Sequence, residues 1–282
     1  MARSDGRPVT GVLAAIDDWP VETAAAAVVG PSGVLASHGP VEHALRLASV
    51  TKPLAALAVL VAVEEEAVSL DDPADPELLP GATLRHLLAH ASGVAPERPL
   101  RSFPPAYRRV YSNVGIELAA GLVEAATGLP FAQYLDEALV RPLGLTATTL
   151  PGSPARDGVS TVADLARVLH ELLSSTGLLS AATRADLATV QYPGLRGVLP
   201  GFGGQDPNDW GLGFEIRGHK LPHWTGATNS PATFGHFGQS GTMMWLDPAA
   251  RLGLVALADR DFGEWAATAW PALSDAVLAE FA

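Results

Sequence analysis

The chain has 282 residues, 48% of them hydrophobic, and a formal net charge of −12. This length allows one large domain or two lobes, and the hydrophobic content excludes wholesale disorder. The negative net charge argues against binding to nucleic acid or to an anionic membrane, since both require a basic surface. The chain has no cysteine, which excludes disulfides, thiol nucleophiles and cysteine-bound metals.

The first predicted element is an amphipathic helix over residues 9–19. The N-terminal twenty residues contain only a short apolar run, at 12–16, which is too short for an export signal. We therefore expect a cytoplasmic protein without a membrane partner. A signal lost from this sequence is the alternative.

Strands at 22–29 and 34–37 flank a turn and predict a hairpin. The helix predicted next, over 49–66, is apolar on most faces and should lie centrally. A loop rich in proline and acidic residues follows at 71–80.

The middle of the chain is predicted to be helical. Helices are expected over 83–90, 115–127, 131–139, 162–174 and 181–190, several of them ending near a glycine. Strands return at 211–217, 242–246 and 252–258, before a final helix at 261–282. This order predicts an α/β lobe formed by 1–70 and 207–282, with a helical lobe inserted at 71–206.

The first chemical motif pairs Ser49 with Lys52, one of only two lysines in the chain. Residues three apart on a helix share a face, so the hydroxyl and the amine can meet. Pro53 suits only a first helical turn, which places Ser49 where the helix dipole favours negative charge. A serine beside a base in such a position suits a nucleophile. The alternative is an N-cap Ser49 with a solvated Lys52.

Tyr111, Ser112 and Asn113 form the second motif. A phenol acts as an acid or a base when a nearby ammonium lowers its pKa. Asn113 offers a donor and an acceptor that could orient Lys52 or a substrate amide. A core tyrosine followed by a turn asparagine is the alternative.

The third motif is the glycine-rich stretch 235–242, which opens an apolar strand pair. Glycine in a strand marks close approach to a ligand or to another strand. Backbone N–H groups there could stabilise an oxyanion. The alternative is a glycine-rich start to a strand.

In this order, the three motifs resemble the serine β-lactamase-like family of class C β-lactamases, D-Ala-D-Ala carboxypeptidases and related esterases. Further matching stretches are 45–52, 84–93, 110–115 and 121–145. The resemblance covers about residues 22–258 and implies an α+β fold. In this fold an antiparallel sheet flanked by helices is formed from both termini, with an inserted all-helical lobe.

The resemblance also implies roles for individual residues. Ser49 would be the acylated nucleophile and Lys52 its proton partner. Tyr111 would share the role of base with Lys52 and would later protonate the leaving group. The substrate would be bound by Asn113, His236, Phe237, Gly238 and Gln239. Backbone N–H groups of Ser49 and Gln239 would form the oxyanion hole. The family needs no metal or other cofactor.

Phe237 departs from the family pattern, which has threonine there. The threonine hydroxyl helps to hold a substrate carboxylate, and a buried carboxylate left unpaired is costly. We therefore expect a hydrolase of a small carboxylic ester. The alternatives are a D-Ala-D-Ala carboxypeptidase or β-lactamase acting on an amide, an acyltransferase, and a non-catalytic binding protein with this fold.

Two histidine groups have simpler interpretations. His86 and His90 have metal-ligand spacing but lack the glutamate of a zinc protease, so a structural role is expected. His219, Lys220 and His223 are expected at the surface, and a place at the mouth of the pocket is the alternative. The irregular segments 193–209 and 220–233 are expected to shape the substrate pocket.

Overall fold

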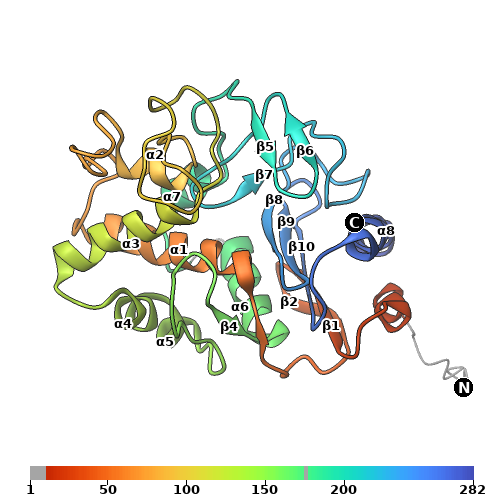
Figure 1. Ribbon diagram of the computed structural model, residues 1–282. Helices are drawn as coiled ribbons and strands as arrows, with labels where there is room; N and C mark the ends of the chain where they lie inside the picture. The colour runs from red at the N-terminus through yellow and green to blue at the C-terminus, as the bar shows by residue number, and fades with distance from the viewer. Residues whose placement is uncertain (1–10, 175–176) are drawn as a thin grey trace, which may run out of the picture.

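The computed structural model describes residues 11–174 and 177–282. The described residues form a six-stranded antiparallel sheet in the order β2-β1-β10-β9-β8-β7, so strands from the two ends of the chain lie side by side (Figure 1). The predicted α+β fold, with flanking helices, is confirmed. The strands are β1 (Ala24–Gly30), β2 (Gly33–His38), β7 (Glu215–Ile216), β8 (Phe234–Gly238), β9 (Thr242–Asp247) and β10 (Leu252–Ala258).

Helices cover both faces of the sheet. The C-terminal helix α8 (Glu264–Phe281) and the 3-10 helix η1 (Val12–Asp18) pack on one face, and α1 (Thr51–Glu64) and α6 (Val162–Leu173) pack on the other. Figure 1 shows the other α-helices on the same side as α1. The remaining helical elements are η2 (Ala48–Val50), α2 (Leu84–Leu88), α3 (Asn113–Thr127), α4 (Phe131–Leu135), the π-helical turn η3 (Asp136–Val140), α5 (Arg141–Leu143) and α7 (Ala181–Leu187).

Two short antiparallel pairs lie outside the large sheet. β3 (Leu45–Arg46) pairs with β4 (Val159–Ser160), and β5 (Gly197–Leu199) pairs with β6 (Gly203–Gln205). Strand β3 directly precedes the turn that contains Ser49. The second pair is a hairpin within the irregular segment 193–209.

Strand β1 is buried on both faces. Ala25, Ala27 and Val29 join the core around α1 and α6, while Ala26 and Val28 join the core beneath α8. Successive side chains of a strand point to opposite faces, so the two cores take alternate residues. The small alanines let both helical layers approach the sheet closely.

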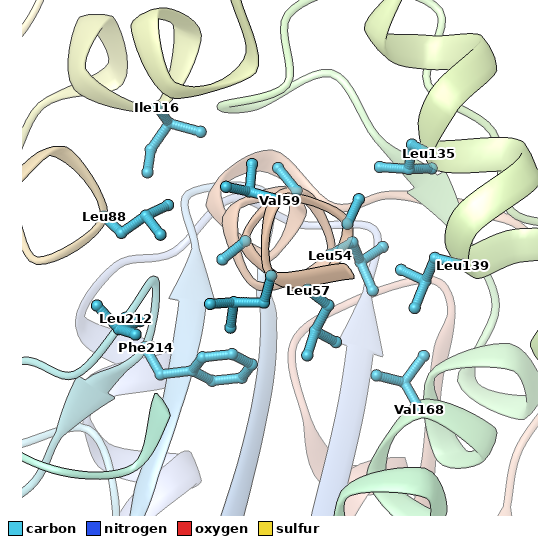
Figure 2. Packing of buried hydrophobic residues seen from close by; sticks show 14 of the residues in the cluster. Leu54, Leu57, Val59, Leu88, Ile116, Leu135, Leu139, Val168, Leu212 and Phe214 are labelled. Carbon is cyan, nitrogen blue, oxygen red and sulfur yellow. The ribbon is translucent and has the colours of Figure 1, made fainter. Parts of the chain in front are cut away.

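Helix α1 is central, as its apolar sequence predicts. Residues 51–62 are all buried. Figure 2 shows its side chains surrounded by those of other elements, among them Leu88, Ile116, Leu135, Leu139, Val168, Leu212 and Phe214. Pro53 lies in the first turn, where the N–H that proline lacks would have no helical partner. The buried helix therefore gives Ser49 and Lys52 a rigid base.

Several predicted elements are shorter than expected, among them the first helix and the strand at 211–217. The first helix is the 3-10 helix η1, and the predicted residues 9 and 10 lie outside the described residues. The strand predicted over 211–217 is reduced to β7, because Gly213 has a φ of +80° and interrupts the extended backbone. The glycine-rich stretch 235–242, expected to open a strand pair, contains most of the buried strand β8 and the turn that leads to β9.

The predicted division into two lobes stays a prediction. Helix α6 belongs to the segment 71–206, yet it packs on strands β1 and β10 of the sheet. Part of the inserted segment therefore forms one core with the terminal segments.

Within the described residues, no single helix has the length and apolar character needed to cross a membrane. Asn113–Thr127 and Phe131–Leu143 meet these criteria only when taken together, and they are bent by 85° relative to each other.

Candidate active site

Ser49 lies in η2, in the short turn that leads into α1. Two hydroxyl groups from the far end of the chain fix the backbone before it. Ser240 Oγ donates to Arg46 O at 2.7 Å, and Thr242 Oγ1 donates to Leu47 O at 2.8 Å. The central sheet therefore holds the turn that carries Ser49.

The Ser49 hydroxyl contacts both partners that the sequence suggested. Lys52 Nζ lies 3.0 Å from Ser49 Oγ, and Tyr111 Oη lies 2.7 Å from the same oxygen. Ser49 is thus no simple N-cap, because its hydroxyl contacts these two side chains. An amine from the same segment and a phenol from a distant one therefore both lie within hydrogen-bond distance of the serine oxygen.

Lys52 is fully buried, which contradicts the alternative of a solvated lysine. Its Nζ donates to Asn113 Oδ1 at 2.6 Å and to Ala155 O at 2.9 Å. Burial lowers the pKa of the Lys52 ammonium to about 7, although the Glu97 carboxylate raises it. Near neutral pH a substantial fraction of the amine is therefore unprotonated and able to accept a proton.

Tyr111 and Asn113 are placed by the start of helix α3. Ser112 is the N-cap, and its hydroxyl accepts from Gly115 N. Asn113 Nδ2 donates to Glu97 Oε1 at 2.6 Å, which turns the amide oxygen toward Lys52. Burial raises the pKa of the Tyr111 phenol well above its ordinary value, so at neutral pH the phenol keeps its proton.

Gly238 is required by a close approach between β8 and the Ser49 turn. A Cβ added to Gly238 would lie 2.2 Å from Leu47 O and 3.2 Å from Ser49 N. The following residue, Gln239, lines the cavity at Ser49. The backbone at Gly238 therefore runs directly beside the backbone of the Ser49 turn.

The cavity beside Ser49 has a volume of about 150 Å³. Its walls are mainly aromatic and aliphatic, and the residues that line it with Ser49 are Tyr111, Leu199, Pro200, Trp210, Glu215, His236, Phe237 and Gln239. Hollows of about 420 Å³ adjoin it on two sides. One shares Gln239 and is bordered by Arg46 and Arg156, and the other shares Tyr111 and Pro200 and is largely apolar.

The segment 193–209 reaches this cavity through Leu199 and Pro200, as predicted for an irregular loop that shapes the pocket. The other long segment, 220–233, provides none of the described lining residues of this cavity. It lies behind the wall instead.

His236 lies in the cavity wall as a neutral imidazole. Its Nδ1 is 2.7 Å from Phe237 O and must carry the proton to donate there. Burial, together with the nearby Lys52 charge, lowers the pKa of His236 to about 3. Its Nε2 has no hydrogen-bond partner among the described residues. His236 therefore brings no positive charge to the cavity at neutral pH.

The Phe237 ring is part of an aromatic cluster beneath α8. It contacts the rings of Phe262, Phe202, Trp224 and Trp270 at centroid distances of 5.1 to 5.9 Å. The side chain at this position is therefore held by core packing, and it provides no hydroxyl for a substrate carboxylate.

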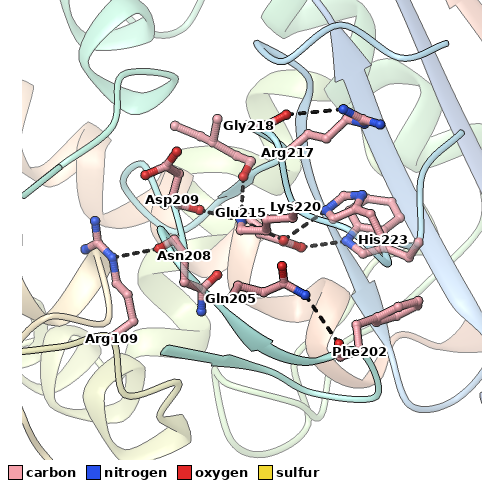
Figure 3. Close-up of polar contacts among 12 residues, drawn as sticks. Arg109, Phe202, Gln205, Asn208, Asp209, Glu215, Arg217, Gly218, Lys220 and His223 are labelled. Carbon is pink, nitrogen blue, oxygen red and sulfur yellow. Dashed lines mark hydrogen bonds and ion pairs between the residues drawn. The ribbon is translucent and has the colours of Figure 1, made fainter. Parts of the chain in front are cut away.

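Glu215 is a cavity residue that the sequence analysis missed (Figure 3). It is buried, and its carboxylate accepts from Lys220 Nζ at 2.8 Å, His223 Nε2 at 3.0 Å and Trp224 Nε1 at 2.5 Å. The prediction that Lys220 and His223 lie at the surface is wrong, because both are buried as partners of Glu215. A single carboxylate in the apolar run from Trp210 to Ile216 was the available signal.

Arg109 is a second residue that the sequence analysis missed, and it has a structural role in the segment that leads to Tyr111. Its buried guanidinium donates to Ala89 O at 2.8 Å and Asn208 O at 3.0 Å, and also to Gln191 O. These bonds join the segment that carries Tyr111 to the loop before β7.

The two histidines with metal-ligand spacing have separate partners. His86 Nδ1 contacts Thr83 and Tyr192, whereas His90 Nδ1 accepts from Ser112 N. The His90 ring packs against Tyr111, with their centroids 4.8 Å apart. Both imidazoles therefore support the fold around α2, as their structural interpretation predicts.

Comparisons with known proteins agree with this geometry. The family model described as Beta-lactamase matches residues 17–278. The crystal structure of a beta-lactamase from Mycobacterium bovis is 55% identical, with a TM-score of 0.93, and the match covers 96% of this chain and 99% of that one.

More distant relatives carry other descriptions. A protein of Escherichia coli O157:H7, provisionally described as a D-alanyl-D-alanine carboxypeptidase, is 27% identical over 237 residues, covering 67% of this chain and 54% of the relative. The chain therefore spans about half the length of this curated relative. EstCE1, a hydrolase with promiscuous acyltransferase activity, is 18% identical with a TM-score of 0.79, covers 96% of this chain and 97% of its own, and shows the fold alone.

Proposed function

This chain belongs to the beta-lactamase family of serine hydrolases, and on that premise we propose that it cleaves a small carboxylic ester through an acyl-enzyme intermediate on Ser49. The observation that carries the proposal is the contact of one hydroxyl oxygen, Ser49 Oγ, with both Lys52 Nζ and Tyr111 Oη. A base and an acid within hydrogen-bond reach of the nucleophile are what acyl transfer requires.

In the acylation step, Ser49 Oγ attacks the ester carbonyl carbon and its proton passes to neutral Lys52. The pKa of Lys52, about 7, suits a base that works near neutral pH. The backbone N–H groups of Ser49 and Gln239 would stabilise the oxyanion. When the C–O bond to the alcohol breaks, Tyr111 gives its proton to the leaving oxygen and is reprotonated from Lys52.

In the deacylation step, water attacks the acyl carbon and transfers a proton to the amine. The bond from the acyl carbon to Ser49 Oγ then breaks, and the serine oxygen recovers a proton from the cluster. The carboxylic acid leaves with the water oxygen, and the site returns to its starting protonation state.

Phe237 favours an ester substrate without a carboxylate. A β-lactam or a D-Ala-D-Ala peptide carries a carboxylate that needs a donor near the nucleophile, and Phe237 offers none. The second candidate, a β-lactamase or D-Ala-D-Ala carboxypeptidase, rests on the Mycobacterium bovis and Escherichia coli relatives.

The test compares wild-type protein with Ser49→Ala on p-nitrophenyl butyrate, nitrocefin and a D-Ala-D-Ala peptide, with and without an added alcohol. Ser37→Ala, a change at an exposed serine on β2, is the matched control. We expect the wild type and the control to hydrolyse the ester and to be labelled by a fluorophosphonate. Ser49→Ala should lose both the hydrolysis and the labelling. Undiminished turnover in Ser49→Ala rejects the proposal.

The other substrates identify the competing functions. Nitrocefin turnover comparable to ester turnover favours a β-lactamase, and release of D-alanine favours a carboxypeptidase. Transfer of the butyryl group to the alcohol in preference to water favours an acyltransferase.

A further inference from the structure

The wall of the Ser49 cavity has one formally charged side chain among its described residues, and that side chain is an acid. The lining contains Glu215 but no lysine or arginine. Glu215 is 2% exposed, so bulk water does little to screen its charge. Any acyl group that enters the cavity therefore meets a poorly screened negative charge.

The partners of Glu215 keep it ionised without the help of a substrate. Lys220 Nζ donates to Glu215 Oε1 and also to Asp209 O at 2.8 Å. His223 Nδ1 accepts from Thr225 N, so His223 Nε2 carries the proton that it donates to Glu215. These donors lower the pKa of Glu215 far below its ordinary value, despite its burial.

The positive partners lie behind the wall and do not face the cavity. Lys220 and His223 are absent from its described lining, whereas Glu215 is part of it. Tyr111 and His236 line the same cavity as Glu215, and the Glu215 carboxylate acts to raise the pKa of both, although burial lowers that of His236 overall. The ion pair thus presents its negative end to the substrate.

A buried ion pair is a poor device for stability, because desolvation of both charges offsets their attraction. Its position in the wall of the reaction cavity suggests a functional reason for keeping it. We propose that Glu215 is a specificity-determining residue that excludes anionic acyl groups from the Ser49 cavity, so that the enzyme takes esters of short uncharged acids. This inference rests on the proposed ester hydrolase function and names its substrate class.

Two esters with the same leaving group test the inference on the wild-type enzyme. p-Nitrophenyl butyrate and mono-p-nitrophenyl succinate have acyl chains of similar length, but the succinate ends in a carboxylate. We expect kcat/KM for the butyrate to exceed that for the succinate by at least about tenfold, because like charges brought together in a poorly screened site repel strongly. Equal values overturn the inference and leave the ester hydrolase intact, whereas hydrolysis of neither ester overturns both.

A variant then assigns the preference to Glu215. Replacing Glu215→Gln alone would leave Lys220 buried without its counter-ion, so we pair it with Lys220→Met. The new amide has a single acceptor oxygen, so it keeps one of the two bonds, from His223 at Oε1 or from Trp224 at Oε2. The butyrate-to-succinate ratio should fall several-fold in this double variant, provided that circular dichroism and thermal unfolding show a folded protein.

Asp209→Asn is the matched control. Asp209 lies beside Lys220, and its carboxylate raises the pKa of Lys220, but it does not line the cavity. We expect its butyrate-to-succinate ratio to equal that of the wild type. A ratio that stays unchanged in the folded double variant, or that falls equally in the control, overturns the assignment to Glu215. If the double variant does not fold, the wild-type ratio alone decides whether anionic acyl groups are excluded.

Discussion

Lys52 Nζ lies 4.7 Å from the centroid of the Tyr111 ring, and both side chains contact the same serine oxygen. Burial lowers the pKa of Lys52 to about 7 and raises that of Tyr111. At neutral pH a large part of the protein therefore holds an uncharged amine beside a protonated phenol. In these protonation states the amine can act as a base and the phenol as an acid.

The first prediction concerns the pH profile. A base must be unprotonated, so kcat/KM for p-nitrophenyl butyrate should rise with pH through about 7 and then level off. Lys52→Met should lower kcat by about 10²–10⁴-fold and abolish this rise. Stopped-flow or steady-state rates between pH 5 and 9 measure both effects, after correction for spontaneous hydrolysis. A wild-type profile that is flat across this range would contradict Lys52 as the base.

The second prediction concerns two exposed charges near Lys52. The Glu97 carboxylate raises the pKa of Lys52, and the Arg156 guanidinium lowers it. Glu97→Gln should therefore move the acid limb of the pH profile to lower pH, and Arg156→Gln should move it to higher pH. Because both side chains are about half exposed, each shift should be below about one unit. Shifts in the same direction in both variants would show that the acid limb of the pH profile reflects the ionisation of a group other than Lys52.

The third prediction concerns the phenol. Tyr111→Phe removes the proton donor but keeps the ring that packs against His90 and Trp210. We expect kcat to fall by about 10²–10⁴-fold with little change in the unfolding temperature. An ester with a better leaving group needs less protonation of its alcohol, so p-nitrophenyl butyrate should lose less activity than ethyl butyrate. Equal losses on both esters would argue against Tyr111 as the acid for the leaving group.

The fourth prediction concerns the close contact at Gly238. In Gly238→Ala the new methyl group would meet Leu47 O at 2.2 Å and Thr242 Oγ1 at 2.4 Å, so the Ser49 turn must move. We expect a loss of about 1–3 kcal/mol in the free energy of unfolding and a fall of about 100-fold in kcat.

Gly121→Ala on α3 serves as the control, because an added Cβ there meets no atom within 4 Å. It should leave activity unchanged and stabilise the protein by about 0.5–1 kcal/mol through helix propensity. Urea denaturation and ester hydrolysis measure both variants, and full activity in Gly238→Ala would contradict the proposed backbone geometry.

The family and the fold class could be predicted from the sequence because their signals are local. The spacing of Ser49 and Lys52, with Pro53 behind them, fixes a serine and a lysine on one face at the start of a helix. The continuous apolar run of β1 and the apolar composition of α1 likewise indicate burial directly. The roles of the site residues, the cytoplasmic location, the division into lobes and the ester preference stay predictions.

The burial and the charge state of the ionisable side chains around the site are determined only by the tertiary structure. Lys220 and His223 are polar residues in an irregular segment, so the sequence predicted them at the surface. They are buried because Glu215, on strand β7, accepts hydrogen bonds from both. The lowered pKa of Lys52 has the same kind of origin, since it depends on the segments that exclude water from the amine. Charge state and burial are set by atoms brought together from distant positions, and no local spacing encodes them.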